Sequence, residues 1–255
     1  MKQTILEIKD LNFSFSKEKQ ILKNINFSIE KGSLCIIAGK NGSGKSVLLK
    51  CIKGLLNPQS GSIIIKGEEV AKNKIERRRK IGLVFQDADS QIVGQTVEKD
   101  ILFGMENLEL DEKTKKERLQ NVTQLLSLEN KLKSRPRELS GGEKRRLAIA
   151  GILAMDPDII FLDEPFANLD YPGVTQVLKT LLTLQEKGHS IIIVSHEIDK
   201  IAAHSQKIIL LRNGEVVKDD TSENVLPLLK DNGVYVPSKN DNELVPLEEL
   251  SWLKH

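Results

Sequence analysis

Residues 34–50 are Leu-Cys-Ile-Ile-Ala-Gly-Lys-Asn-Gly-Ser-Gly-Lys-Ser-Val-Leu-Leu-Lys, and they give the strongest indication of the fold. Its first five residues form an apolar run typical of a buried strand, and a glycine-rich turn leads from them into a segment with helical spacing. The pattern Gly-x-x-x-x-Gly-Lys-Ser between a strand and a helix predicts a phosphate-binding loop. An accidental glycine-rich turn is the alternative, and the flanking strand and helix argue against it. The predicted nucleotide-binding residues are Gly39, Lys40, Asn41, Gly42, Ser43, Gly44, Lys45, Ser46 and Val47.

Two side chains of the loop have chemical roles in this interpretation. The glycines let successive backbone N–H groups face the phosphates, and the positive end of the following helix points at the same place. Lys45 adds a positive charge beside the β- and γ-phosphates, and the hydroxyl of Ser46 is suited to Mg²⁺. The predicted cofactors are therefore ATP and Mg²⁺.

Length, charge and composition favour a globular α/β protein without a membrane-spanning segment. A chain of 255 residues is long enough for one large α/β domain or for a domain with a subdomain, and its net charge of +2 argues against a nucleic-acid partner. The two cysteines, Cys35 and Cys51, fall in the apolar strand and the helix and are expected to be core residues in a reducing cytosol. The N-terminus lacks a signal-peptide core, and no apolar run is long enough to span a bilayer. A membrane role would therefore require a partner.

Polar residues follow three further apolar segments that predict strands. Gln86 follows residues 81–85, the pair Asp163-Glu164 follows 159–162, and His196 follows 190–195. Adjacent acids at the end of a buried strand are costly unless they have a function. In a phosphate-loop protein Asp163 would hold Mg²⁺, and Glu164 would orient or deprotonate the attacking water. His196 could reach a γ-phosphate, whereas structural or surface roles are expected for the other histidines, His189, His204 and His255.

Residues 87 to about 150 have helical apolar spacing and predict an inserted helical subdomain. Within it, Ser140, Gly141 and Gly142 precede a helix over 144–155, with Ser140 as its N-cap. Bare amides at a helix N-terminus can bind a second anion, and an ordinary helix cap is the alternative.

The rest of the chain predicts supporting elements. We expect antiparallel strands over 4–9 and 24–30, a hairpin turning at Asn213-Gly214, and a helix over 222–230. The basic run 77–80 is expected to be a solvated face, and residues 231–255 a loosely packed extension. Phe15 could stack on an adenine, although a core or edge-strand aromatic is the simpler expectation from spacing alone.

The motifs in this order resemble the ATP-binding-cassette (ABC) ATPase family, and the resemblance covers residues 2–230. It implies an α/β fold: a P-loop NTPase core with a mainly parallel sheet, an antiparallel β subdomain and the inserted α-helical subdomain at about 87–150. The extension 231–255 follows this ABC domain of residues 1–230. The resemblance implies that Phe15 stacks on adenine, that Lys45, Gln86, Glu164 and His196 are catalytic, and that Ser46, Gln86 and Asp163 hold the metal.

The family signature matches Leu139–Glu143, although the last position is usually Gln, and position 47 is Val where Thr is usual. Neither departure is expected to prevent ATP binding. The family also implies a head-to-tail dimer with a second ABC ATPase chain, the same or homologous. In that dimer Ser140, Gly141 and Gly142 would contact the ATP held by the partner's phosphate loop.

The segment 84–107 resembles the energy-coupling-factor ATPases, which drive uptake of vitamins or of cobalt and nickel ions. The features that carry this resemblance are the residues Gln91 to Thr96 and the run Phe103-Gly-Met-Glu-Asn107. It implies integral membrane partners, namely an energy-coupling transmembrane protein and a substrate-binding subunit, and a peripheral position on the cytoplasmic face of the membrane. A soluble assembly ATPase, such as the iron–sulfur-cluster type, or the ATPase of another ABC transporter class is the alternative. A DNA-repair or translation ATPase and a non-enzymatic nucleotide-binding module are disfavoured by the single phosphate loop and by the intact acid pair.

Overall fold

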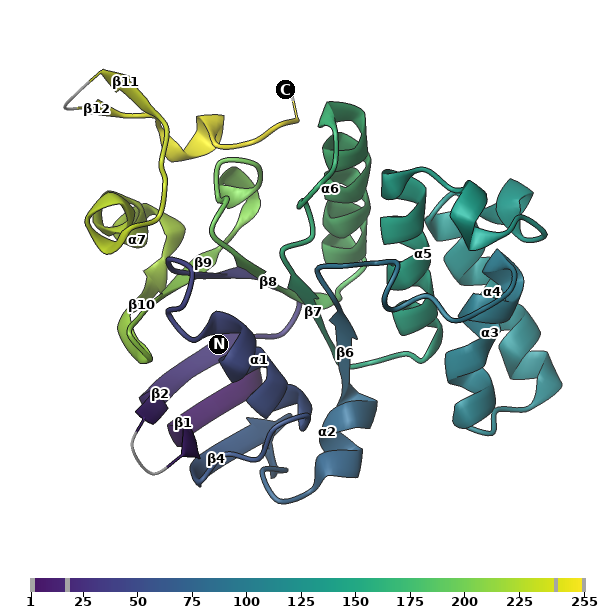
Figure 1. Ribbon diagram of the computed structural model, residues 1–255, viewed down its shortest axis with the longest axis horizontal. Coiled ribbons are helices and arrows are strands. Elements are labelled where there is room, and N and C mark those ends of the chain that lie inside the picture. The colour runs from purple at the N-terminus through teal and green to yellow at the C-terminus, as the bar shows by residue number, and fades with distance from the viewer. Residues whose placement is uncertain (1–2, 17–18, 241–242, 254–255) are drawn as a thin grey trace.

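The computed structural model describes residues 3–16, 19–240 and 243–253 and contains two main sheets (Figure 1). The first is six-stranded, with the order β10-β9-β3-β8-β7-β6. Its strands are β3 (Leu34–Ala38), β6 (Ile81–Val84), β7 (Ile159–Asp163), β8 (Ser190–Ser195), β9 (Lys207–Arg212) and β10 (Glu215–Thr221). All neighbours pair in parallel except β9 and β10, which form the predicted hairpin. The four central strands β3, β8, β7 and β6 therefore present their carboxyl ends at one edge, where α/β folds place ligands.

The second sheet is antiparallel, with the order β2-β1-β4-β5. Its strands are β1 (Thr4–Ser16), β2 (Lys19–Glu30), β4 (Ser60–Ile65) and β5 (Glu68–Glu69). One face of this sheet packs with α1 (Lys45–Lys53) and with the adjacent face of the parallel sheet in a single apolar cluster. Cys35 and Cys51 lie in that cluster, which confirms the prediction that both are core residues.

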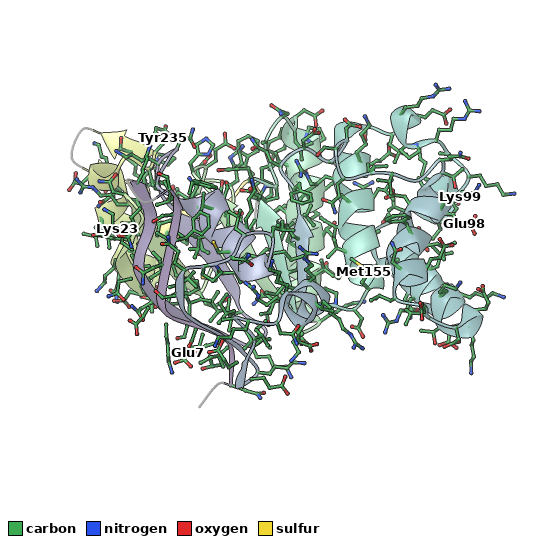
Figure 2. The ribbon with its side chains drawn as sticks, turned by 60° about the horizontal axis from the view of Figure 1, so that its bottom comes forward. Glu7, Lys23, Glu98, Lys99, Met155 and Tyr235 are labelled. Carbon is green, nitrogen blue, oxygen red and sulfur yellow. The ribbon has the colours of Figure 1, made fainter. Side chains whose placement is uncertain are left out.

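Helices form the opposite end of the molecule, with α5 and α6 beside the sheet and α3 and α4 beyond them (Figure 1). Their bounds are α3 (Val97–Asn107), α4 (Glu112–Leu125), α5 (Gly141–Ala154) and α6 (Tyr171–Glu186). α3 packs closely on the end of α5 at Gly104, where a Cβ would lie 2.7 Å from the sulfur of Met155. Figure 2 shows how elongated the molecule is, with Glu98 and Lys99 at the helical end and Tyr235 at the other. Within the described residues, we find no helix with both the length and the apolar character to cross a membrane.

The basic run 77–80 is not simply a solvated face. It forms the end of a helix, α2 (Lys74–Lys80), and Arg77 is only 1 % exposed. The Arg77 guanidinium donates to the carbonyl of Cys51 over 2.5 Å, so it satisfies a carbonyl in the last turn of α1. The prediction is therefore wrong for Arg77. The basic run itself gives no sign that this side chain bonds a buried carbonyl of a distant helix.

The prediction of a loosely packed C-terminal extension is also wrong. After α7 (Ser222–Leu229), the chain forms the short strands β11 (Ser238–Asn240) and β12 (Glu243–Leu244). Val234, Val236 and Leu250 are buried in the same core cluster as α5 and α6. Figure 1 shows this segment in yellow at the top of the view, running towards the upper end of α6.

Candidate nucleotide site

The loop between β3 and α1 has the backbone of a phosphate cradle. Gly44 caps α1 with a φ of 108°, a conformation that favours glycine. Gly39 has no room for a side chain, because a Cβ there would lie 2.3 Å from the carbonyl oxygen of Leu211. The hydroxyl of Ser43 is buried without a hydrogen-bond partner among the described residues. An orphaned donor inside a turn of this shape fits an anion that is bound during function.

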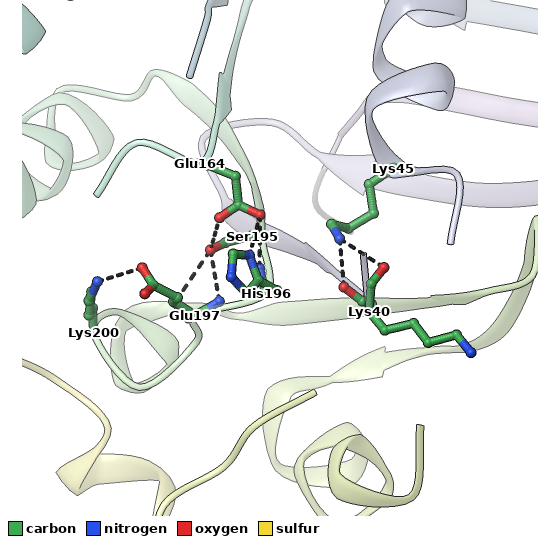
Figure 3. A network of polar contacts seen from close by, with 8 residues as sticks. Lys40, Lys45, Glu164, Ser195, His196, Glu197 and Lys200 are labelled. Atoms are coloured by element: carbon green, nitrogen blue, oxygen red, sulfur yellow. Dashed lines mark hydrogen bonds and ion pairs between the residues drawn. The ribbon is translucent and has the colours of Figure 1, made fainter. Parts of the chain in front are cut away.

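Lys45 is nearly buried, with 6 % of its surface exposed. Its ammonium donates to the carbonyls of Gly39 and Lys40 over 2.6 and 3.2 Å, so the loop wraps around it (Figure 3). Burial lowers the pKa of Lys45, and the charges of Glu164 and Asp163 oppose that shift. The side chain of Lys40 lies outside this cradle, beside Gly233.

The predicted strand-end residues converge on the same loop. A cavity of about 500 Å³ is lined by Phe15, Ile21, Asn41, Gly42, Gly44, Lys45, Ser46, Val47, Gln86, Glu164 and His196. Gln86, Glu164 and His196 meet there because β3, β8, β7 and β6 are adjacent parallel strands whose carboxyl ends share one edge. Phe15 and Ile21 reach the cavity from β1 and β2 of the other sheet. The Phe15 ring is 67 % exposed at this cavity, whereas its neighbour Phe13 is buried and meets it edge to face at 4.9 Å. An exposed ring at the mouth of the cavity is available for stacking on a base.

Glu164 is held in a strained and specific position. Its φ of 45° is unusual for a residue with a side chain, and its surface is only 7 % exposed. One carboxylate oxygen accepts from the hydroxyl of Ser195 at 2.7 Å. The other lies 2.7 Å from Nδ1 of His196 and accepts from the His196 amide at 3.2 Å (Figure 3). The carboxylate and the imidazole therefore form one unit that lines the cavity together with Lys45.

The oxygen ligands expected for Mg²⁺ are present. Ser46 and Gln86 line the cavity around Lys45, and Asp163 lies close enough to Ser46 for the hydroxyl to affect the pKa of its carboxyl. Burial raises the pKa of Asp163, and the Ser46 hydroxyl opposes that shift. The part of the chain that the structure describes contains no group of three or more His, Cys, Asp or Glu side chains that could hold a metal alone. One carboxylate, one hydroxyl and one amide fit Mg²⁺ better than a softer metal, because Mg²⁺ takes few protein ligands and completes its shell with phosphates and water.

The second predicted anion motif is well formed but lies elsewhere. Ser140 and Glu143 form a reciprocal capping box at the start of α5: Ser140 Oγ accepts from the Glu143 amide, and Glu143 accepts from the Ser140 amide. Lys131 pairs with Glu143 at 3.2 Å. Glu143, which stands where the family usually has Gln, therefore still caps the helix. Its negative charge is balanced by Lys131. The residues 139–143 are absent from the lining of the cavity around Lys45, although all of them are described.

Three contributors were missed from the sequence. Ser195 holds Glu164, yet it seemed only the last residue of a strand. Arg145 on α5 is 3 % exposed and donates to the carbonyls of Phe85 and Gln86 over 2.5 and 2.6 Å. Ile21 lines the cavity beside Phe15. Only Ser195 had a local signal, its position directly before His196.

Comparison with known proteins agrees with this geometry. Residues 22–167 match the family model described as ABC transporter. The chain is 40 % identical to the energy-coupling factor transporter ATP-binding protein EcfA of Methanococcus maripaludis, over 87 % of this chain and 81 % of that protein. It is 36 % identical to EcfA1 of Enterococcus faecalis, over 98 % and 97 % of the two chains.

A solved structure has the same fold over most of its length. CbiO1 from Clostridium perfringens, described as part of the ABC transporter complex CbiONQ, superposes with a TM-score of 0.82 at 34 % identity. The match covers 88 % of this chain and 91 % of CbiO1. The phosphate loop, the buried acid and histidine, and these relatives agree: the chain belongs to the ABC transporter family of ATP-binding proteins and is an ATPase of the energy-coupling-factor kind.

Proposed function

We propose that this chain is the ATP-hydrolysing subunit of a membrane importer of the energy-coupling-factor type, for a vitamin or a transition-metal ion. The names of its relatives support an importer over a soluble assembly ATPase. Its partners would be an energy-coupling transmembrane protein, a substrate-binding membrane subunit and a second ABC ATPase chain. In that assembly it would lie on the cytoplasmic face of the membrane.

The observation that carries the catalytic proposal is the Glu164 carboxylate, fixed by Ser195 and His196 in the cavity that contains Lys45. In the proposed reaction Lys45 and the loop amides bind the β- and γ-phosphates. Glu164 orients the attacking water and accepts its proton, and His196 contacts the γ-phosphate. Ser46, Asp163 and Gln86 would hold Mg²⁺, which when bound neutralises charge on the phosphates.

A head-to-tail dimer explains why the chain has two helix N-termini suited to anions. Ser140 and the amides of Gly141 and Gly142 lie outside the cavity of their own chain, so they are available to the nucleotide of a partner chain. Arg145 links the two regions, because it extends from the helix that begins at Gly141 to the backbone of Gln86. Movement of α5 on ATP binding would therefore be transmitted to the loop that follows β6.

The test is the substitution Glu164→Gln, which keeps the shape and removes the base. We expect ATP affinity within about threefold of the unmodified protein and a turnover at least about 100-fold lower. Glu186→Gln, at the exposed end of α6, is the matched control. Undiminished turnover in Glu164→Gln would refute the role of the base. Affinity purification of the tagged chain from detergent-solubilised cells tests the importer: recovery of soluble assembly proteins without a membrane subunit would contradict it.

A further inference from the structure

The C-terminal segment lies against the loop that follows β8, where the proposed catalytic histidine is found. The backbone of Tyr235 forms a bridge with Glu197, and the carbonyl of Leu250 accepts from the amide of Ala203 over 3.0 Å. Residues 196–200 lie outside helices and strands, apart from that single bridge. Their position therefore depends on what packs against them.

Trp252 makes the most specific of these contacts. Its indole Nε1 donates to the carboxylate of Asp199 at 3.1 Å, and its amide donates to the carbonyl of Lys200 at 3.3 Å. The Lys200 ammonium lies 5.0 Å from the centre of the Trp252 ring, a cation–π arrangement, and Lys200 is only 7 % exposed. One side chain thus fixes two consecutive residues of the loop.

Trp252 also contacts the start of α6. Its ring stacks on Tyr171 with centroids 5.6 Å apart and planes 28° apart, and its carbonyl accepts from the Tyr171 hydroxyl over 3.1 Å. Tyr171 follows Asp170, which caps α6 by accepting from the amide of Gly173. This cap ends the loop that begins at Glu164. Trp252 therefore joins the segment after Glu164 to the segment after His196.

A short chain of contacts continues from Trp252 to the Glu164 carboxylate. Lys200 pairs with Glu197 over 2.5 Å (Figure 3). The amide of Glu197 donates to the Ser195 hydroxyl at 3.0 Å, and that hydroxyl donates to Glu164 at 2.7 Å. His196 lies between Ser195 and Glu197 in the sequence, so the same contacts fix the backbone on both sides of it. Its imidazole contacts the same Glu164 carboxylate.

We propose that Trp252 is a positioning residue for ATP hydrolysis: it anchors residues 197–200 against the start of α6 and so holds His196 and Ser195 on Glu164. The proposal rests on the proposed roles of Glu164 and His196. Trp252 touches neither the nucleotide cavity nor the phosphate loop, so it acts on the hydrolytic step rather than on ATP binding.

The test compares Trp252→Ala and Trp252→Phe with the unmodified chain, each in the detergent-purified assembly that the tagged chain recovers. We expect Trp252→Ala to lower kcat about tenfold with the KM for ATP changed by less than about twofold, because misplaced catalytic groups slow the reaction while the phosphate cradle is intact. Trp252→Phe keeps the stacking and the cation–π face but loses the donor to Asp199. Its kcat should lie between those of the unmodified chain and Trp252→Ala. Tyr171→Phe, at a half-exposed position, removes only the hydroxyl and should lower kcat about twofold.

The matched control is Lys239→Ala, which removes an exposed ion pair with Glu249 in the same extension and should leave kcat unchanged. A second background separates positioning from general stability. In the His196→Ala protein, Trp252→Ala should lower kcat by clearly less than tenfold, since one of the two groups that it positions is gone.

Three results would overturn the proposal: an unchanged kcat in Trp252→Ala, an equal tenfold loss in the His196→Ala background, or a loss that appears in KM instead. If Glu164→Gln still abolishes turnover in the same preparations, such a result removes the role of Trp252 and leaves the proposed function intact. If Glu164→Gln retains turnover, the proposed role of Glu164 as the base, on which the role of Trp252 rests, is itself refuted.

Discussion

Arg145→Ala tests how the helical part of the chain is joined to the nucleotide site. Arg145 lies on α5, and its two guanidinium NH₂ groups donate to the carbonyls of Phe85 and Gln86 over 2.5 and 2.6 Å. Nothing else that the structure describes offers these carbonyls a side-chain donor. The substitution therefore removes the side-chain donor of both carbonyls at a point where Arg145 is 3 % exposed.

The size of the effect follows from these two bonds. Each hydrogen bond from a charged donor contributes about 1.5–3 kcal/mol, which gives a gross loss of about 3–6 kcal/mol. Burial lowers the pKa of Arg145, and its Nε has no partner among the described residues, so the native protein already bears a desolvation cost that the substitution removes. We expect the free energy of unfolding to fall by about 3 kcal/mol.

Urea unfolding followed by circular dichroism measures this change directly. Lys144→Ala is the matched control, because the adjacent Lys144 makes only a surface ion pair with Asp89 at 2.7 Å and should cost less than about 1 kcal/mol. Arg145→Lys keeps the charge but loses the two-pronged geometry, so it should recover only part of the loss. An Arg145→Ala protein as stable as Lys144→Ala, with the same slope against urea, would show that the two hydrogen bonds of Arg145 do not stabilise the fold.

Two further predictions concern buried titratable groups. Burial raises the pKa of both Cys35 and Cys51 to about 12. A disulfide reagent at pH 8 should therefore label neither thiol in the native protein and both after unfolding in guanidinium. Rapid labelling of the native chain would contradict this prediction. Burial lowers the pKa of His189 below its usual 6.5. The unfolded chain then binds more protons at His189 than the folded chain below about pH 6.5, so the wild type should lose stability relative to His189→Gln as the pH falls from about 7.5 to 5.5. Two parallel curves of unfolding free energy against pH would show that His189 contributes nothing.

Most strands could be predicted because the signal for each is local. The apolar runs give β3 over Leu34–Ala38 and β8 over Ser190–Ser195, in agreement with the prediction, and Asn213-Gly214 marks the hairpin turn. β1 runs to Ser16, well past the predicted end at residue 9, because register shifts in its pairing with β2 break the two-residue alternation. α6 begins two residues before the predicted Gly173, since Asp170 caps it and the proline after Tyr171 is tolerated in the first turn.

In the nucleotide site, too, some residues have a local sequence signal and others do not. The strand-end positions of Gln86, Asp163, Glu164 and His196 could be predicted from the sequence, because each follows an apolar run and parallel strands bring their carboxyl ends together. Their catalytic and metal-binding roles stay predictions. The partners that fix these residues could not be found, because they come from distant parts of the chain. Arg145, for example, lies 60 residues from Phe85, and nothing in its local sequence indicates the carbonyls that it will meet.

The strained backbone of Glu164 bears on the proposed role of the C-terminal extension. A φ of 45° at a residue with a side chain persists only where the surroundings determine it from several sides. The Glu164 amide donates to the carbonyl of Val194 at 2.8 Å, and its carboxylate is bonded by Ser195 and His196. Among the described residues, the hydrogen-bond partners of Glu164 outside its own loop therefore all lie at the end of β8. That end continues directly into the loop that Trp252 anchors. A tail rich in Pro, Asn and acids gives no periodic signal, yet its packing bears on how firmly the most strained residue of the site is held.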